Sequence, residues 1–163
     1  MRIILKNKET LLYNDFEFKC CIGEKGSTFK KKEGDKKTPK GIFSLGPLFY
    51  RKDRIPKPIT NIKKKEIRKT MGWCDDANSA NYNKLIKVSN KIKHEKLFQK
   101  KNNYDLLIPI NYNTKKPKKN KGSAIFIHLT KNYMKTLGCI ALKKNDFLIL
   151  LKLINKKTKI QIL

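Results

Sequence analysis

The apolar residues of this chain come in short runs that mostly alternate with polar residues, and none approaches the roughly 20 residues of a membrane span. Alternation with a period of two is typical of half-buried strands. Arg2–Asn7 and Leu11–Gly23 alternate in this way and are expected to be strands. Ser123–Leu129 is expected to be a buried strand, and further strands are placed at Ile42–Tyr50, Asn81–Ser89, Tyr104–Asn113 and Thr158–Leu163.

Two segments have helical spacing instead. Lys93–Asn102 would turn Leu97 and Phe98 toward the interior. Lys143–Lys157 carries an apolar stripe, and Asn145 is its expected N-cap. Because strands outnumber helices, the expected fold class is mostly β with a helix packed on the strands, an α+β fold.

Length and loop composition indicate one domain over residues 1–163. A chain of 163 residues is long enough for one core and too short for two comfortable ones. Gly23–Gly41 is rich in Gly, Lys and Pro, and reads as an exposed loop rather than a linker because strand-like sequence follows at once. We expect Arg54–Thr70 to be irregular with a short helical turn, and Thr114–Gly122 to be a charged loop.

The formal net charge is +27, which implies attraction to polyanions such as nucleic acid, anionic lipid or acidic cell-wall polymers. Lys, Asn and Ile are over-used together, which is also the signature of an A+T-rich coding sequence. Aromatic residues are not interleaved with basic ones in a recognised nucleic-acid motif, so no specific nucleic-acid partner is expected. Selected polyanion binding and coding composition both remain open explanations of the charge.

The four cysteines do not form a disulfide framework in a chain of this length. Cys20 and Cys21 are adjacent, so a strand would point them to opposite faces. Cys74 is read as structural. No CxxC or HxxxH pair occurs, and a metal site is therefore not expected.

Cys139 has the surroundings of a candidate nucleophile. It follows a glycine in KTLGCIAL (Lys135–Leu142), and His128 lies eleven residues upstream in an apolar strand. A catalytic cysteine needs a base or an imidazolium for its thiolate, and backbone N–H donors for the oxyanion. The N–H groups of Gly138 and Cys139 are the candidate donors, and Thr136 could add a hydroxyl hydrogen bond to the substrate.

The alternative is a small buried cysteine after a turn glycine, with His128 as a satisfied core residue. Thiol reactivity separates the two interpretations. A nucleophilic Cys139 held as a thiolate beside an imidazolium would have a low pKa and label fast near neutral pH, whereas a core cysteine would not.

Four segments resemble the L,D-transpeptidase catalytic domain of the YkuD type and occur in that family's order: GDKKTPKGIFSLG (Gly34–Gly46), MGWCDDANSANYNKLI (Met71–Ile86), GSAIFIHL (Gly122–Leu129) and TLGCIALKKNDFLILL (Thr136–Leu151). The first is similar to the family's G-D-x-x-T-P-x-G-x-F segment, and the last to its S/T-x-G-C-I-x-L nucleophile motif. Together they cover nearly the whole chain, and the tryptophan segment resembles a short, compact branch. The resemblance implies a β-sandwich-like scaffold, Cys139 as nucleophile, His128 as its base and no cofactor.

The chain departs from the family's pattern at two positions beside the nucleophile. Leu137 stands where many members have His, and Ala141 stands where many have Arg. A missing arginine removes a planar, bidentate clamp for a substrate carboxylate. We expect lysine point charges to meet substrate carboxylates instead.

Four residues are weaker candidates for substrate binding: Thr136, already described, and His94, Trp73 and Asp75. His94, with Glu95, reads either as part of a solvated charged pair or as a substrate-facing imidazole. Trp73 reads as a core or cleft-wall residue. Asp75, like Asp76, either caps a turn or binds the ammonium of an acyl acceptor.

By resemblance, the expected activity is peptidoglycan L,D-transpeptidation on tetrapeptide stem peptides in the cell envelope or periplasm. An L,D-carboxypeptidase or amidase on the same site remains an alternative, as does a non-catalytic basic module that binds a polyanion such as an anionic wall or membrane surface. The apolar run in Met1–Tyr13 is too short for a signal-peptide core. We therefore expect a soluble chain, and either export is not encoded in this sequence or a leader has been removed. A cytoplasmic location also stays open, as does the oligomeric state.

Overall fold

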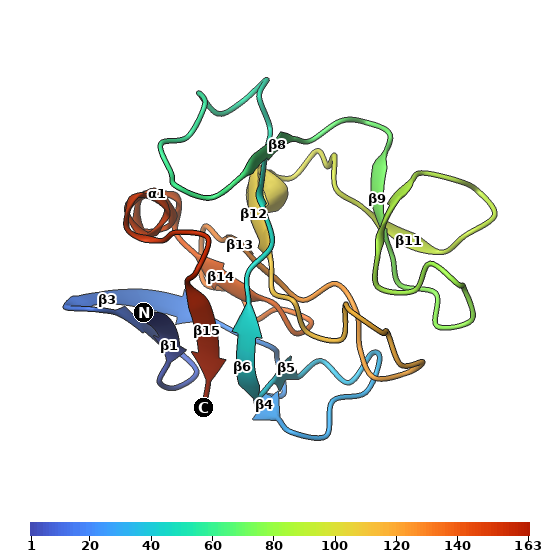
Figure 1. Ribbon diagram of the computed structural model, residues 1–163, viewed down its shortest axis with the longest axis horizontal. Helices are drawn as coiled ribbons and strands as arrows, with labels where there is room; N and C mark the ends of the chain where they lie inside the picture. Colours follow the sequence, from blue (N-terminus) through green and yellow to red (C-terminus); the bar gives the residue numbers. More distant parts are fainter.

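The computed structural model describes all residues, 1–163, and is built around one ten-stranded sheet (Figure 1). Its strand order is β6-β15-β1-β2-β3-β14-β13-β12-β7-β8. The strands of this sheet are β1 (Arg2–Leu5), β2 (Thr10–Tyr13), β3 (Phe16–Cys21), β6 (Gly41–Ser44), β7 (Leu48–Tyr50), β8 (Lys64–Glu66), β12 (Leu106–Pro109), β13 (Phe126–Leu129), β14 (Ile140–Leu142) and β15 (Lys159–Ile162).

Two smaller sheets and two helices complete the fold. A three-stranded sheet has the order β10-β9-β11, and a two-stranded sheet pairs β4 with β5. Their bounds are β4 (Ser27–Thr28), β5 (Thr38–Pro39), β9 (Met71–Cys74), β10 (Leu85–Lys87) and β11 (His94–Lys96), with the 3-10 helix η1 (Asn102–Tyr104) and the α-helix α1 (Lys144–Leu153). The mostly β prediction with one packed helix is confirmed. Neither helix is long and apolar enough to cross a membrane.

The central strands of the large sheet are covered on both faces. In β12, Leu106 and Ile108 join a 25-residue core cluster, whereas Leu107 joins a second cluster of eight buried residues. Adjacent residues of a strand point to opposite faces, which accounts for this division. Helix α1 contributes Phe147 and Leu150 to the larger cluster. The smaller cluster includes Cys139, so the candidate nucleophile lies against the face turned to β9 and β11.

The prediction of a helix at Lys93–Asn102 is wrong. The structure has strand β11 there, and its backbone pairs with β9, so that Glu95 lies opposite Trp73. Leu97 is fully buried, as the helical pattern also required. The last residue of the predicted helix, Asn102, begins η1. His94–Lys96 forms a strand because it pairs with β9, about 20 residues earlier in the chain, and hydrophobic periodicity alone does not reveal such a partner.

The predicted N-cap of the C-terminal helix also needs correction. Lys143 occupies the N-cap position in an extended conformation, without a side-chain hydrogen bond, and Asn145 lies in the first turn. Asp146 in that turn places a negative charge near the N-terminal end of the helix dipole. The helix ends at Leu153, four residues before the predicted boundary.

Candidate active site

Two neighbouring strands bring Cys139 and His128 to one cleft. Strands β13 and β14 are parallel, and His128 is paired with Ala141. Cys139 directly precedes β14, so the nucleophile loop approaches the strand that carries the imidazole. Both residues line a cleft of about 760 Å³.

The Cys139 thiol is buried and hydrogen-bonded to backbone. Its Sγ donates to the Ala124 carbonyl at 3.3 Å and accepts from the Phe126 N–H at 3.3 Å. Burial raises the pKa of the thiol to about 12, and the nearby Glu95 charge adds to the rise. The Phe126 N–H and the Lys31 ammonium act in the opposite direction but do not offset the burial.

The His128 imidazole is also buried, and its orientation is set by a backbone contact. Nδ1 lies 2.9 Å from the Leu129 carbonyl oxygen. This contact assigns the proton of the neutral ring to Nδ1 and leaves Nε2 as the basic nitrogen. Burial lowers the pKa of His128 to about 4. The Tyr104 ring packs edge-on against the imidazole, with centroids 5.2 Å apart.

These pKa directions correct the expected charge state of the pair. A preformed thiolate–imidazolium pair requires a lowered pKa for Cys139 and a raised pKa for His128. In the structure the Cys139 pKa is raised and the His128 pKa is lowered. Near pH 7 the pair is a neutral thiol and a neutral imidazole with a free Nε2. Fast labelling of the free protein at neutral pH is therefore not the property that marks this cysteine as a nucleophile.

The loop before Cys139 is held by Thr136. The Thr136 hydroxyl donates to the Cys139 carbonyl at 2.6 Å and accepts from the Gly138 N–H at 3.1 Å. The Gly138 N–H and the Thr136 hydroxyl are thus engaged within the loop, whereas we had expected both to face a substrate. The Cys139 N–H has no hydrogen-bond acceptor within the protein.

One side of the cleft carries carboxylates. Tyr104 donates its hydroxyl hydrogen bond to Glu95 Oε1, and burial raises the pKa of Glu95. Glu95 is therefore not a solvated surface charge. Asp75 also lines the cleft, with Oδ2 3.9 Å from Lys93 Nζ and a buried Oδ1 that has no partner.

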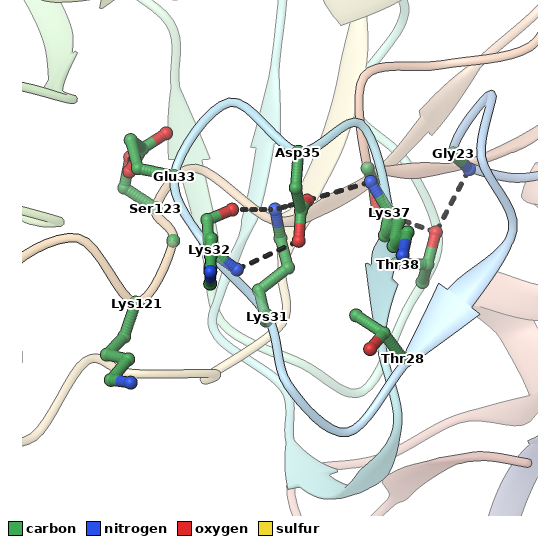
Figure 2. Close-up of polar contacts among 12 residues, drawn as sticks. Gly23, Thr28, Lys31, Lys32, Glu33, Asp35, Lys37, Thr38, Lys121 and Ser123 are labelled. Atoms are coloured by element: carbon green, nitrogen blue, oxygen red, sulfur yellow. Dashed lines mark hydrogen bonds and ion pairs between the residues drawn. The ribbon is translucent and has the colours of Figure 1, made fainter.

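The cleft is also lined by a buried cation, Lys31, on the loop between β4 and β5 (Figure 2). The Lys31 side chain is 3% exposed and donates to Asp35 Oδ1 and to the Lys32 carbonyl at 2.9 Å. Asp35 also accepts the backbone N–H groups of Lys32 and Lys37. Sequence reasoning missed Lys31, because nothing distinguishes one lysine in so basic a chain before its burial is known.

A second carboxylate connects the same loop to the segment that precedes β13, the strand that carries His128. Glu33 accepts the Ser123 hydroxyl at 2.8 Å and the Tyr82 hydroxyl. Figure 2 shows Glu33 beside Ser123. Tyr82 in turn accepts the Gly122 N–H at 3.1 Å. These contacts hold the Lys31 loop against the segment that leads into β13.

Two of the weaker candidates lie outside the cleft. Trp73 is buried beneath it, packed edge-on against Phe126, and its Nε1 donates to Asn83 Oδ1 at 2.9 Å. His94 lines a separate cavity of about 570 Å³, with Nδ1 2.7 Å from the Ile92 carbonyl oxygen. Of the four, only Asp75 and Thr136 share the cleft with Cys139.

Comparison with protein families gives one match. The family model of the YkuD L,D-transpeptidase catalytic domain covers residues 2–162. The chain belongs to this family. A search of curated proteins found no match.

Two positions of this L,D-transpeptidase domain differ from the pattern described above, and the structure shows their surroundings. Ala141 is fully buried between Cys21 and His128 on its two partner strands. Leu137 is exposed at the cleft. Ala141 does not line the cleft, whereas Lys31 is a buried cation that does.

Proposed function

We propose that this chain is a cysteine-dependent L,D-transpeptidase of peptidoglycan. The observation that carries the proposal is the cleft itself: a thiol directly before β14 and an imidazole with a free Nε2 on the neighbouring β13 lie beside a backbone N–H without an acceptor. This set supplies a nucleophile, a base and an oxyanion donor. Family membership supports acyl transfer on stem peptides as its use.

In the first half-reaction, Cys139 Sγ attacks the carbonyl that follows the third, L-centred residue of a tetrapeptide stem. His128 Nε2 accepts the thiol proton as the C–S bond forms, so no thiolate needs to exist beforehand. The Cys139 N–H donates to the developing oxyanion. Collapse breaks the C–N bond, His128 returns the proton to the leaving amine, and D-alanine departs.

In the second half-reaction, an amine of a neighbouring stem attacks the thioester. His128 removes a proton from this amine and returns one to the Cys139 sulfur as the C–S bond breaks. Asp75 lines the cleft, so its carboxylate is the candidate group to bind the ammonium form of the acceptor, which releases one proton to solvent before the neutral amine attacks. If water attacks instead, the same site acts as an L,D-carboxypeptidase. With either acceptor the donor is a peptidoglycan stem peptide, so we propose that the protein acts in the cell envelope or periplasm.

The test is incubation with tetrapeptide muropeptides, followed by mass spectrometry. We expect a cross-linked dimer that has lost one D-alanine, and at least a tenfold loss of product for Cys139→Ala. The chain has two histidines, which form a matched pair: His128→Ala should reproduce the loss, and His94→Ala should not, because His94 lines a different cavity.

The products discriminate among the alternatives. Tripeptide without dimer assigns the hydrolase. No product contradicts an acyltransferase and favours a non-catalytic polyanion-binding module. Residual activity of Cys139→Ala above a tenth of the unmodified protein contradicts Cys139 as the nucleophile. Reversed effects of the two histidine substitutions would mean that the base has been misassigned.

A further inference from the structure

A buried threonine outside the cleft contacts the loop that carries the nucleophile. Thr38 of β5 is fully buried and does not line the cleft. Its hydroxyl accepts the Gly23 N–H at 3.0 Å, a contact visible in Figure 2, and donates to the Gly138 carbonyl at 2.9 Å. One hydroxyl therefore connects the segment after β3 with the nucleophile loop, and Gly138 lies 100 residues after Thr38 in the chain.

The backbone around Thr38 fits closely against both partners. A Cβ on Gly23 would lie 2.6 Å from the Lys36 carbonyl oxygen, and one on Gly138 would lie 2.9 Å from the Lys37 carbonyl oxygen. Gly138 also has a backbone φ of 142°, a value that residues other than glycine rarely adopt. The two glycines thus allow the Lys36–Thr38 backbone to lie between Gly23 and Gly138, where the Thr38 hydroxyl reaches both.

Peptide geometry extends this contact to the catalytic centre. The Gly138 carbonyl and the Cys139 N–H belong to one planar trans peptide unit, in which they point in opposite directions. A hydrogen bond that fixes the carbonyl therefore fixes the direction of the N–H. It also polarises the amide and strengthens the N–H as a donor. This N–H is the one at the nucleophile without an acceptor in the protein.

We propose that Thr38 is a positioning residue for oxyanion stabilisation at Cys139. The inference deepens the proposed function, since it concerns acyl chemistry at the same cysteine, but it does not depend on peptidoglycan as the substrate. The rest of the loop is held independently, by the Thr136 N–H to the Ile22 carbonyl at 2.9 Å and by the Glu24 N–H to the Thr136 carbonyl at 2.8 Å. Loss of the Thr38 hydroxyl should thus free the Gly138–Cys139 peptide plane while the loop stays in place.

The experiment compares two reactions of the Cys139 thiol in Thr38→Val, which keeps the side-chain shape and lacks the hydroxyl. Acylation by p-nitrophenyl acetate forms a C–S bond, passes through an oxyanion and expels p-nitrophenolate. Alkylation by iodoacetamide displaces iodide without an oxyanion. Both are followed at the Cys139 peptide by mass spectrometry, with Cys139→Ala as the background.

We expect Thr38→Val to acylate at least tenfold more slowly than the unmodified protein, which is below the roughly 100- to 1000-fold cost of removing an oxyanion donor outright. Alkylation should stay within about twofold. Thr38→Ser keeps the hydroxyl and should restore acylation to within about threefold. Thr38→Ala, which lacks the hydroxyl and has no added bulk, should give the same separation of the two rates as Thr38→Val.

Three results would overturn the inference: equal losses in acylation and alkylation, which indicate general support of the loop; unchanged acylation; or no acylation of Cys139 in the unmodified protein. Failure of the proposed function is distinguishable. If muropeptides are not processed but ester acylation depends on the Thr38 hydroxyl, the transpeptidase assignment fails and the positioning role stands.

Discussion

At the scale of single residues, burial decides the charge state of the candidate catalytic pair. The thiol of Cys139 and the imidazole of His128 each lose water contact, and in both cases the charged form loses more solvation than the neutral form. The Cys139 pKa rises to about 12 and the His128 pKa falls to about 4, so both groups are neutral near pH 7. Proton transfer must therefore accompany attack on the substrate.

The buried His128 predicts a pH dependence of stability. Its pKa is about 4 when folded and 6.5 ordinarily, so between these values the unfolded chain binds a proton that the folded chain does not. The free energy of unfolding therefore falls as pH decreases from 6.5 to 4, by up to about 3 kcal/mol from this group. His128→Asn, whose amide can still reach the Leu129 carbonyl, should remove that component in urea unfolding curves.

His94→Asn is the matched control for the loss of a histidine, because His94 lines a different cavity from Cys139. If the His128→Asn and unmodified proteins lose stability in parallel over this range, His128 is not held in its neutral form.

At the scale of elements, Asn83 joins the small sheet to the strand that carries His128. Its Oδ1 accepts Trp73 Nε1 at 2.9 Å and the Ala124 N–H at 3.0 Å, and its Nδ2 donates to the carbonyls of Tyr112 and Asn113 at 2.9 and 2.8 Å. Its backbone has a φ of 56° and its side chain is buried. The Ala124 position matters to the site because its carbonyl accepts the Cys139 thiol.

We predict that Asn83→Ala lowers the free energy of unfolding by about 3 kcal/mol, since four hydrogen bonds of about 1 kcal/mol each are lost and buried partners are left unpaired. Asn83→Gly is the control for backbone conformation, because glycine adopts a positive φ freely. It should be destabilised by nearly the same amount, within about 1 kcal/mol. Denaturant unfolding measures both. Full recovery of stability in Asn83→Gly would assign the effect to φ rather than to the hydrogen bonds.

At the scale of the whole molecule, charge and chemistry are separable. Forty Lys and Arg face only 13 Asp and Glu, so most basic side chains have no acidic partner. Exposed charges act through solvent and are screened beyond a Debye length of about 8 Å at physiological ionic strength. Cys139 and His128 are buried, and their chemistry is shielded from this field.

If the lysines recruit an anionic wall surface, binding to intact sacculi should fall steeply as salt increases. Acylation by a small soluble muropeptide should change little over the same range. A pelleting assay and an acylation rate, each titrated with salt, measure the two responses. Parallel, shallow curves would contradict recruitment by charge and leave coding composition as the reason for the lysines.

The fold class and most strands could be predicted from sequence because their information is local. The short apolar run in Ser123–Leu129 and the apolar stripe after Lys143 indicate a buried strand and a helix without reference to distant residues. The strand at His94–Lys96 could not be predicted, because β9 supplies its backbone partners. Leu97 is buried under either assignment, so hydrophobic spacing did not distinguish them.

The sequence by itself also determined the family and the candidate pair, since Cys139 and His128 stand in recognisable motifs. Only the tertiary structure decided which polar residues surround that pair. Lys31 and Thr38 come from a lysine-rich segment about 100 residues earlier, and their importance follows from burial and hydrogen bonds to distant backbone. His94 and Trp73 were separated from the cleft by the same tertiary packing. The physical reason is that desolvation and hydrogen-bond geometry depend on what packs around a side chain, and residue spacing does not contain that information.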